Sequence, residues 1–113
     1  MSTFVSYEVA VQLIRELREL VPQIKKHDPD LADQIHRAAT SALNLAEGQR
    51  RTAGNQRKHY EIAHGSANEV RACLDVAEAW GWIADPKPLR AMVNRLLALL
   101  WGLTAVRQAP AKP

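Results

Sequence analysis

The sequence predicts an all-α protein that forms an antiparallel up-down-up-down four-helix bundle. Apolar residues make up 47% of the 113 residues and aromatic residues only 5%, so the apolar set is mostly Ala, Leu, Val and Ile, which suits closely packed helices. Apolar side chains recur at intervals of three and four residues, as on one face of an α-helix. Short joints separate four such segments, and short connections place consecutive helices antiparallel.

The first two helices are expected at about residues 5–26 and 29–50. Pro22 lies late in the first and could kink or end it, because an interior proline removes a hydrogen bond. Asp28 and Pro29 form the start signal of the second helix, as N-cap and first helical residue. Gly48 is a candidate stop for this helix, since glycine accepts the left-handed conformation that closes many helices.

The last two helices are expected at about residues 55–80 and 86–107. The third ends near Trp80-Gly81-Trp82, and Asp85-Pro86 is expected to cap the fourth in the same manner as Asp28-Pro29 caps the second. The bundle would then occupy residues 1–109, followed by a disordered tail over residues 110–113.

The fourth helix has an apolar face that is wider than one bundle seam requires. Leu97 and Trp101 lie off its main stripe, and Trp82 precedes the helix as a further exposed aromatic residue. The surplus suggests a second buried surface, most simply a contact between subunits. Trp82, Leu97 and Trp101 are therefore the interface candidates, and a homo-oligomer is expected.

Composition places the protein in the cytoplasm. The single cysteine cannot form an internal disulfide, and the first residues lack the pattern of a signal peptide. No apolar run reaches the roughly 18 residues that a membrane span needs, so no membrane partner is expected. The net charge of +3 is too mild by itself to indicate a nucleic-acid-binding protein.

The basic residues nevertheless gather in two places. The hinge between the second and third helices has no acidic residue between Gly48 and Tyr60, and the segment 85–113 has five basic residues against one acid. On one subunit these are ordinary solvated charges, but a ring would repeat them as a positive rim able to displace counterions from RNA. The candidate nucleic-acid-binding residues are Arg50, Arg51, Arg57 and Lys58, followed by Arg90, Arg95 and Arg107.

No catalytic constellation is evident, so we predict no enzymatic activity, cofactor or metal. Two carboxylate-x-x-His pairs suggest a di-metal bundle, but the fourth helix has no Asp or Glu after Asp85 to complete such a site. Cys73 has no neighbouring base signature and is expected to be buried. Phosphate-cradling glycine motifs are also missing from the sequence.

Several segments together resemble the bacterial 23S rRNA intervening-sequence proteins. They are Gln34-Ile35-His36-Arg37-Ala38-Ala39, Asn44-Leu45-Ala46-Glu47-Gly48, Ala63-His64-Gly65-Ser66-Ala67-Asn68-Glu69 and Gly81-Trp82-Ile83, within residues 7–105. The resemblance implies a four-helix bundle that assembles into a ring, typically a pentamer. This fold is also distantly similar to the accessory proteins of diversity-generating retroelements, which partner a reverse transcriptase and its RNA. His36 departs from the family pattern, where a second arginine is usual, and the mid-helix proline of the second helix is missing.

The motif residues have a structural and a functional interpretation. Asn44 with Glu47, and Ser66 with Glu69, each project from one side of a helix, and we expect the two pairs to meet between the second and third helices. Gly65 is expected to let these helices approach closely. A hydrogen-bonded network that fixes helix register is favoured over a binding pocket. The family-motif residues are Arg37, Asn44, Glu47, Gly48, Gly65, Ser66 and Glu69.

Two functional hypotheses follow. The first is a non-catalytic homo-oligomer that binds RNA or a ribonucleoprotein through basic surface residues. The alternative is a protein-binding scaffold that recruits a partner enzyme, such as a reverse transcriptase, with no direct contact to nucleic acid.

Overall fold

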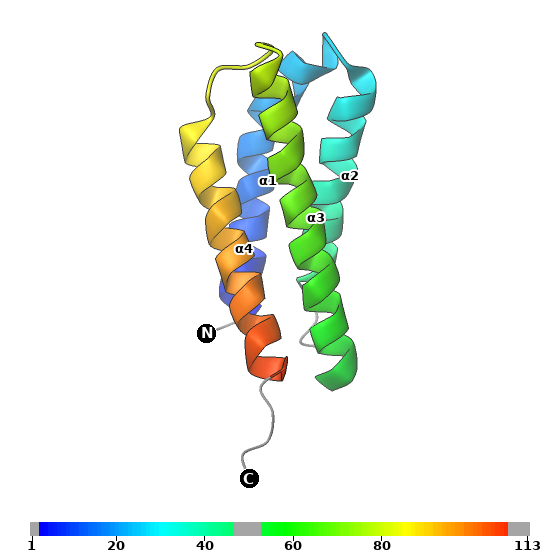
Figure 1. Cartoon of the computed structure of the whole chain (residues 1–113), viewed down its shortest axis with the longest axis vertical. Helices are drawn as coiled ribbons and strands as arrows, with labels where there is room; N and C mark the ends of the chain where they lie inside the picture. Colours follow the sequence, from blue (N-terminus) through cyan, green and yellow to red (C-terminus); the bar gives the residue numbers. More distant parts are fainter. Residues whose placement is uncertain (1–2, 47–52, 109–113) are drawn as a thin grey trace.

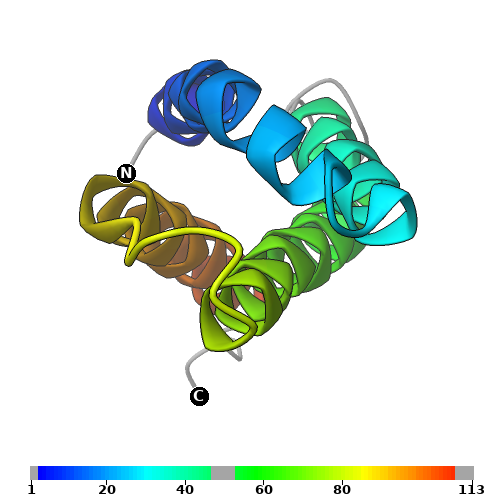
Figure 2. The ribbon, with the colours of Figure 1, turned by 90° about the horizontal axis from the view of Figure 1, so that it is seen from above.

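The computed structural model describes residues 3–46 and 53–108, and these form four α-helices and no strand. The helices are α1 (Thr3–Lys25), α2 (Pro29–Leu45), α3 (Ala53–Ala79) and α4 (Lys87–Gln108). Each helix contacts the next, and α4 returns to contact α1, so that the four axes stand at the corners of a square (Figures 1 and 2). Neighbouring helices run antiparallel (Figure 1), as the sequence predicts.

The predicted helix limits differ from the structure mainly at the end of α2. The other three helices begin and end within two residues of the predicted positions. The expected extension of α2 to residue 50 is wrong, because α2 ends at Leu45 and the N–H of Ala46 closes it with a 3.0 Å hydrogen bond to the carbonyl of Ala42. The hinge residues Glu47, Gly48, Arg50 and Arg51 and the tail 110–113 lie outside the described residues.

Two helix ends are closed by capping hydrogen bonds. The carboxylate of Asp28 accepts a 3.0 Å hydrogen bond from the N–H of Leu31, which caps α2 as predicted. After α3, Gly81 has a φ of +78°, and hydrogen bonds from its N–H to the carbonyl of Glu78 (2.9 Å) and from the N–H of Trp82 to that of Ala77 (3.0 Å) form a Schellman motif.

Asp85 does not cap α4 in the way that Asp28 caps α2. Its carboxylate accepts a hydrogen bond from Nε of Arg90 at 3.1 Å, while its backbone carbonyl accepts one from the N–H of Lys87 at 3.0 Å. The side chain is therefore used for an ion pair between the loop and α4.

The core differs in composition from one pair of helices to another. Small side chains dominate the buried faces of α2 and α3, whereas branched aliphatic side chains dominate those of α1 and α4. Leu97 belongs to this core, with 7% of its surface exposed, so its prediction as an interface residue is wrong. The buried alanines of α2 and α3 include Ala38, Ala39, Ala42, Ala63, Ala67 and Ala77, and the aliphatic residues of α1 and α4 include Leu13, Leu17, Ile24, Val93, Leu96 and Leu100.

Candidate functional site

Polar side chains of α2 and α3 line a groove on the outer surface between these two helices. Two adjoining hollows share Arg37 and Ser41, which makes the groove continuous along α2. Its hydrogen-bonding side chains offer amide, hydroxyl and guanidinium donors and one carboxylate. We define the α2–α3 polar groove by Gln34, Arg37, Ser41, Asn44, Ser66 and Glu69.

Two hydrogen bonds cross the α2–α3 polar groove. Nε2 of Gln34 donates to Oε2 of Glu69 at 2.9 Å, and the hydroxyls of Ser41 and Ser66 lie 3.0 Å apart. The prediction that the motif residues of α3 face α2 is correct, but their partners are Gln34 and Ser41, and no hydrogen bond between described residues joins Asn44 to them. The alignment of the two antiparallel helices along each other decides which residues pair. The spacing of residues within one helix gives no information about this alignment.

Arg37 is the cation of this groove and is weakly held. Its Nε lies 3.2 Å from Oδ2 of Asp33, one turn earlier on α2. Both side chains are largely exposed, 73% and 63%, and an exposed pair of this kind contributes only about 0.3–0.5 kcal/mol. The guanidinium can therefore exchange Asp33 for another anion at little cost.

Further basic residues lie at the end of the bundle where α2 ends and α3 begins (Figure 1). Arg57 and Lys58, near the start of α3, are exposed and form no ion pair with a described residue. Arg95 is also exposed, on α4. Arg107 lies in the last turn of α4, and its side chain is outside the described residues.

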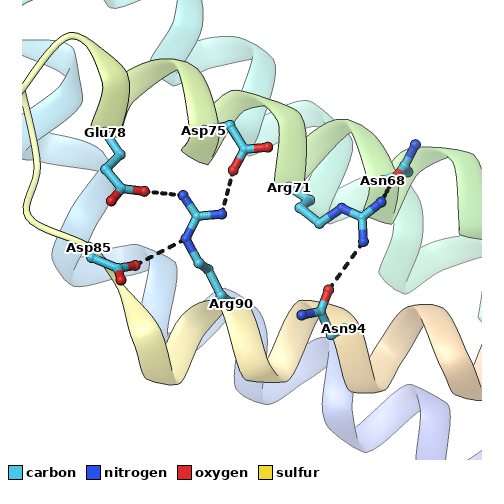
Figure 3. A network of polar contacts seen from close by, with 7 residues as sticks. All are labelled: Asn68, Arg71, Asp75, Glu78, Asp85, Arg90 and Asn94. Atoms are coloured by element: carbon cyan, nitrogen blue, oxygen red, sulfur yellow. Dashed lines mark hydrogen bonds and ion pairs between the residues drawn. The ribbon is translucent and has the colours of Figure 1, made fainter.

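Arg90 is a different kind of cation, because three carboxylates surround it (Figure 3). Nη1 pairs with Asp75, Nη2 with Glu78, and Nε with Asp85 at 3.1 Å. The hydrogen bond to Asp75 is the main cause that raises the pKa of Arg90, opposed by burial and assisted by Glu78. The guanidinium joins α3, the following loop and α4, so we remove Arg90 from the nucleic-acid-binding candidates.

Arg71 is a polar contact residue that the sequence did not reveal. Its guanidinium donates to Oδ1 of Asn68 on the same helix (2.7 Å) and to Oδ1 of Asn94 on α4 (3.2 Å), as Figure 3 shows. Arg71 and Arg90 thus connect α3 to α4 at two levels. Nothing in the local sequence marks this pairing, since Arg71 and Asn94 are 23 residues apart.

The aromatic side chains divide into one stacked group and one isolated ring. Trp82 is half-buried, and its ring is nearly parallel to those of His27 (5.4 Å between centroids) and Trp80 (6.0 Å). Trp101 lies on α4 beside His64 of α3 and is 59% exposed. Among the predicted interface residues, Trp101 therefore has a large free surface. Trp80, 70% exposed, is another exposed ring, and the sequence did not single it out.

The space around Gly65 is open, with no atom of a neighbouring element within 4 Å of the position that a Cβ would take. The expectation that Gly65 allows close approach of α2 is therefore wrong.

Cys73 is buried as expected. Its burial, together with the nearby charge of Glu69, raises the pKa of its thiol to about 11. Near neutral pH this thiol is protonated and a poor nucleophile.

The motif residues that carry the resemblance are thus concentrated in the α2–α3 polar groove. A sequence model of the family described as 23S rRNA-intervening sequence protein matches residues 3–102. The chain belongs to this family. No curated protein and no solved structure shows significant similarity to this family member.

Two other features are absent from the described part of the chain. Within residues 3–46 and 53–108, no group of three or more His, Cys, Asp or Glu side chains is placed to hold a metal ion. None of the helices in the same part of the chain combines the length and apolar character needed to cross a membrane.

Proposed function

We propose that this 23S rRNA-intervening sequence protein is a non-catalytic homo-oligomer that binds structured RNA, or a ribonucleoprotein, through phosphate contacts. The observation that supports the proposal is the placement of exposed, uncommitted cations: Arg57 and Lys58 lie at the end of the bundle toward which the α2–α3 polar groove runs. Arg37 adds a weakly paired guanidinium within the groove itself. Guanidinium, ammonium, amide and hydroxyl donors are the groups that contact phosphates and sugars.

The oligomer multiplies this weak charge. One copy carries a net charge of only +3, but a ring repeats each cation around its axis, and the family resemblance implies a pentamer. Arg50 and Arg51, in the adjoining hinge segment, would add to the same rim. Because phosphate contacts carry no sequence information, binding should depend weakly on RNA sequence and strongly on salt.

The test compares two charge reversals at opposite ends of the bundle. Arg57→Glu/Lys58→Glu should lower the affinity for a fluorescent RNA hairpin about tenfold or more at low salt and reduce the slope of log affinity against log salt by about two. Lys25→Glu/Lys26→Glu makes the same change in charge at the opposite end of the bundle, where α1 ends. This variant should leave both the affinity and the salt slope near those of the wild type. Adding Arg50→Glu and Arg51→Glu to the first variant should abolish binding.

Equal losses in the two double variants would mean that overall charge governs binding, and unchanged affinity after reversal of Arg57 and Lys58 would contradict the proposed surface. A wild type without measurable affinity for RNA at low salt would favour the second candidate, a scaffold that recruits a partner enzyme such as a reverse transcriptase. Exposed Trp80 and Trp101 support this alternative, because tryptophan often anchors protein interfaces. A scaffold would copurify with a protein partner, and the association would change little with salt.

A further inference from the structure

A second groove lies between α1 and α2 and adjoins the polar groove, because His36 and Thr40 border both hollows. Its volume is about 360 Å³, near the lower end of the range for ligand pockets. Most of its surface is apolar. We define the α1–α2 apolar groove by its apolar lining, Ile14, Leu17, Val21, Pro22, Ile35 and Ala39, and its polar lining, Arg15, Arg18, His36 and Thr40.

The charged side chains of this groove are Arg15 and Arg18, and no carboxylate lines it. Arg15 contacts Gln12 at 3.4 Å, and Arg18 lies 3.7 Å from Glu19 with both side chains at least 77% exposed. Contacts this long and this exposed hold a guanidinium weakly. Both arginines can therefore turn over the groove when an occupant arrives.

Apolar walls beside mobile guanidinium groups select an aromatic occupant. A guanidinium is attracted to the face of an aromatic ring, most strongly to that of tryptophan. The apolar walls bury the rest of the ring, and a tryptophan inserted in a pocket is a common energetic anchor of protein interfaces. An extended polar ligand would leave this lining unused.

The chain itself exposes a suitable ring. Trp101 lies beside His64, on the α3–α4 side of the bundle, which is opposite the α1–α2 side (Figure 2). It projects from a regular helix and is 59% exposed, with its ring tilted against His64, whereas Trp80 lies beyond the end of α3 with its ring stacked on Trp82. A contact that joins two different surfaces of identical copies is heterologous, and it can be repeated from copy to copy until a ring closes.

We infer that Trp101 of one copy inserts into the α1–α2 apolar groove of the next, with Arg15 and Arg18 over the indole. This inference rests on the self-association included in the proposed function and specifies its contact. The groove spans residues 14–22 of α1, toward the α1–α2 turn, whereas Trp101 lies toward the opposite end of the bundle. Neighbouring bundles are consequently offset along their length and tilted relative to the ring axis.

Sedimentation velocity at a series of protein concentrations tests the contact. Trp101→Ala should weaken self-association at least about tenfold, the effect expected of an interface anchor. Trp80→Ala removes an equally large exposed ring outside the contact and should sediment like the wild type. Arg15→Ala/Arg18→Ala should weaken association as well, and adding it to Trp101→Ala should have little further effect, because both changes remove the same contact.

A mixing experiment tests the heterologous geometry directly. Trp101→Ala retains an intact groove, and Ile14→Glu, at a half-buried groove position, retains an intact Trp101. Each variant should be monomeric alone, and the mixture should form one-to-one dimers that cannot grow, since each pair has one functional contact. Circular dichroism melting of both variants verifies that they are folded.

Three results would overturn the inference: a monomeric wild type at about 100 µM, an unchanged oligomer in Trp101→Ala, or no dimer in the mixture of folded variants. These results are separable from a failure of the RNA proposal. If Trp101→Ala remains assembled while reversal of Arg57 and Lys58 abolishes RNA binding, the contact is wrong and RNA binding stands. If Trp101→Ala is monomeric and the assembled wild type binds no RNA, the reverse holds.

Discussion

The α2–α3 and α3–α4 sides of the bundle use arginine in opposite ways. Arg37 on the first side has one exposed carboxylate partner, and 73% of its side chain is accessible. Arg90 on the second has three carboxylate partners from α3 and the following loop, and 24% of its side chain is accessible. The sequence alone cannot tell which of these two arginines is structural, but their partners in the structure can. Arg90 stabilises the fold, whereas Arg37 is available to a ligand.

Replacing each arginine by alanine should give the largest difference in the free energy of unfolding. Arg90→Ala should lower the free energy of unfolding by about 2–3 kcal/mol, because it removes charge-assisted hydrogen bonds and leaves Asp75, Glu78 and Asp85 close together without a cation. Arg37→Ala should cost less than about 0.5 kcal/mol. Urea denaturation followed by circular dichroism measures both values.

Arg90→Lys serves as the control for charge alone. Lysine retains the positive charge but cannot form three directed hydrogen bonds from one planar group, so its free energy of unfolding should lie between those of wild type and Arg90→Ala. Equal destabilisation by Arg37→Ala and Arg90→Ala would remove the distinction between the two sides.

The alkaline range should reveal how well the α2–α3 side excludes water. Burial raises the pKa of the Cys73 thiol from 9.0 to about 11, so above pH 9 the unfolded chain loses this proton before the folded one does. The resulting loss of stability should reach on the order of 2 kcal/mol at pH 11. Denaturation of wild type and Cys73→Ala between pH 8 and pH 11 isolates this contribution, since the other titrating groups are common to both proteins.

The variant Cys73→Ala should therefore lose less stability than the wild type over this pH interval. Parallel pH profiles would show that the thiol titrates alike in the folded and unfolded states, and hence that solvent reaches this part of the core.

A smaller effect than those of Arg90 and Cys73 is expected at the serine pair across the α2–α3 polar groove. Ser66→Ala should reduce the free energy of unfolding by about 1 kcal/mol, through loss of the 3.0 Å hydrogen bond to Ser41. The double variant Ser41→Ala/Ser66→Ala should be no less stable than either single variant, because both changes remove the same bond. Additive losses in urea denaturation would show that the two hydroxyls act independently.

Local sequence signals predicted the helices well and their side-chain partners poorly. Asp28 acts within a few residues of its own position, so cap chemistry identified it, and the predicted end of the third helix near Gly81 is likewise a local signal. Arg90 was assigned to a free basic cluster because its partners on α3 are 12 and 15 residues away in sequence. Such contacts depend on how two helices are aligned, which periodicity within each helix does not specify.

Leu97 and Gly65 show the same limit for packing. A helix at the corner of a square packs against two neighbours, and α4 contacts both α1 and α3. Its buried arc is therefore wider than one seam, so Leu97 is buried within the single copy. Gly65 faces open space instead of α2. The prediction failed because a single glycine does not specify how α3 is rotated about its own axis.

The order of helix contacts also bears on how this chain folds. Three of the four main helix pairs among the described residues join helices that follow each other in sequence, and the fourth, α1–α4, joins the first and last helices of the chain. Contacts between nearby segments cost little loop-closure entropy, and chains rich in them fold fast. The α1–α4 pair must close the longest loop, so its docking is expected to come last and to complete the core around Leu13 and Leu100.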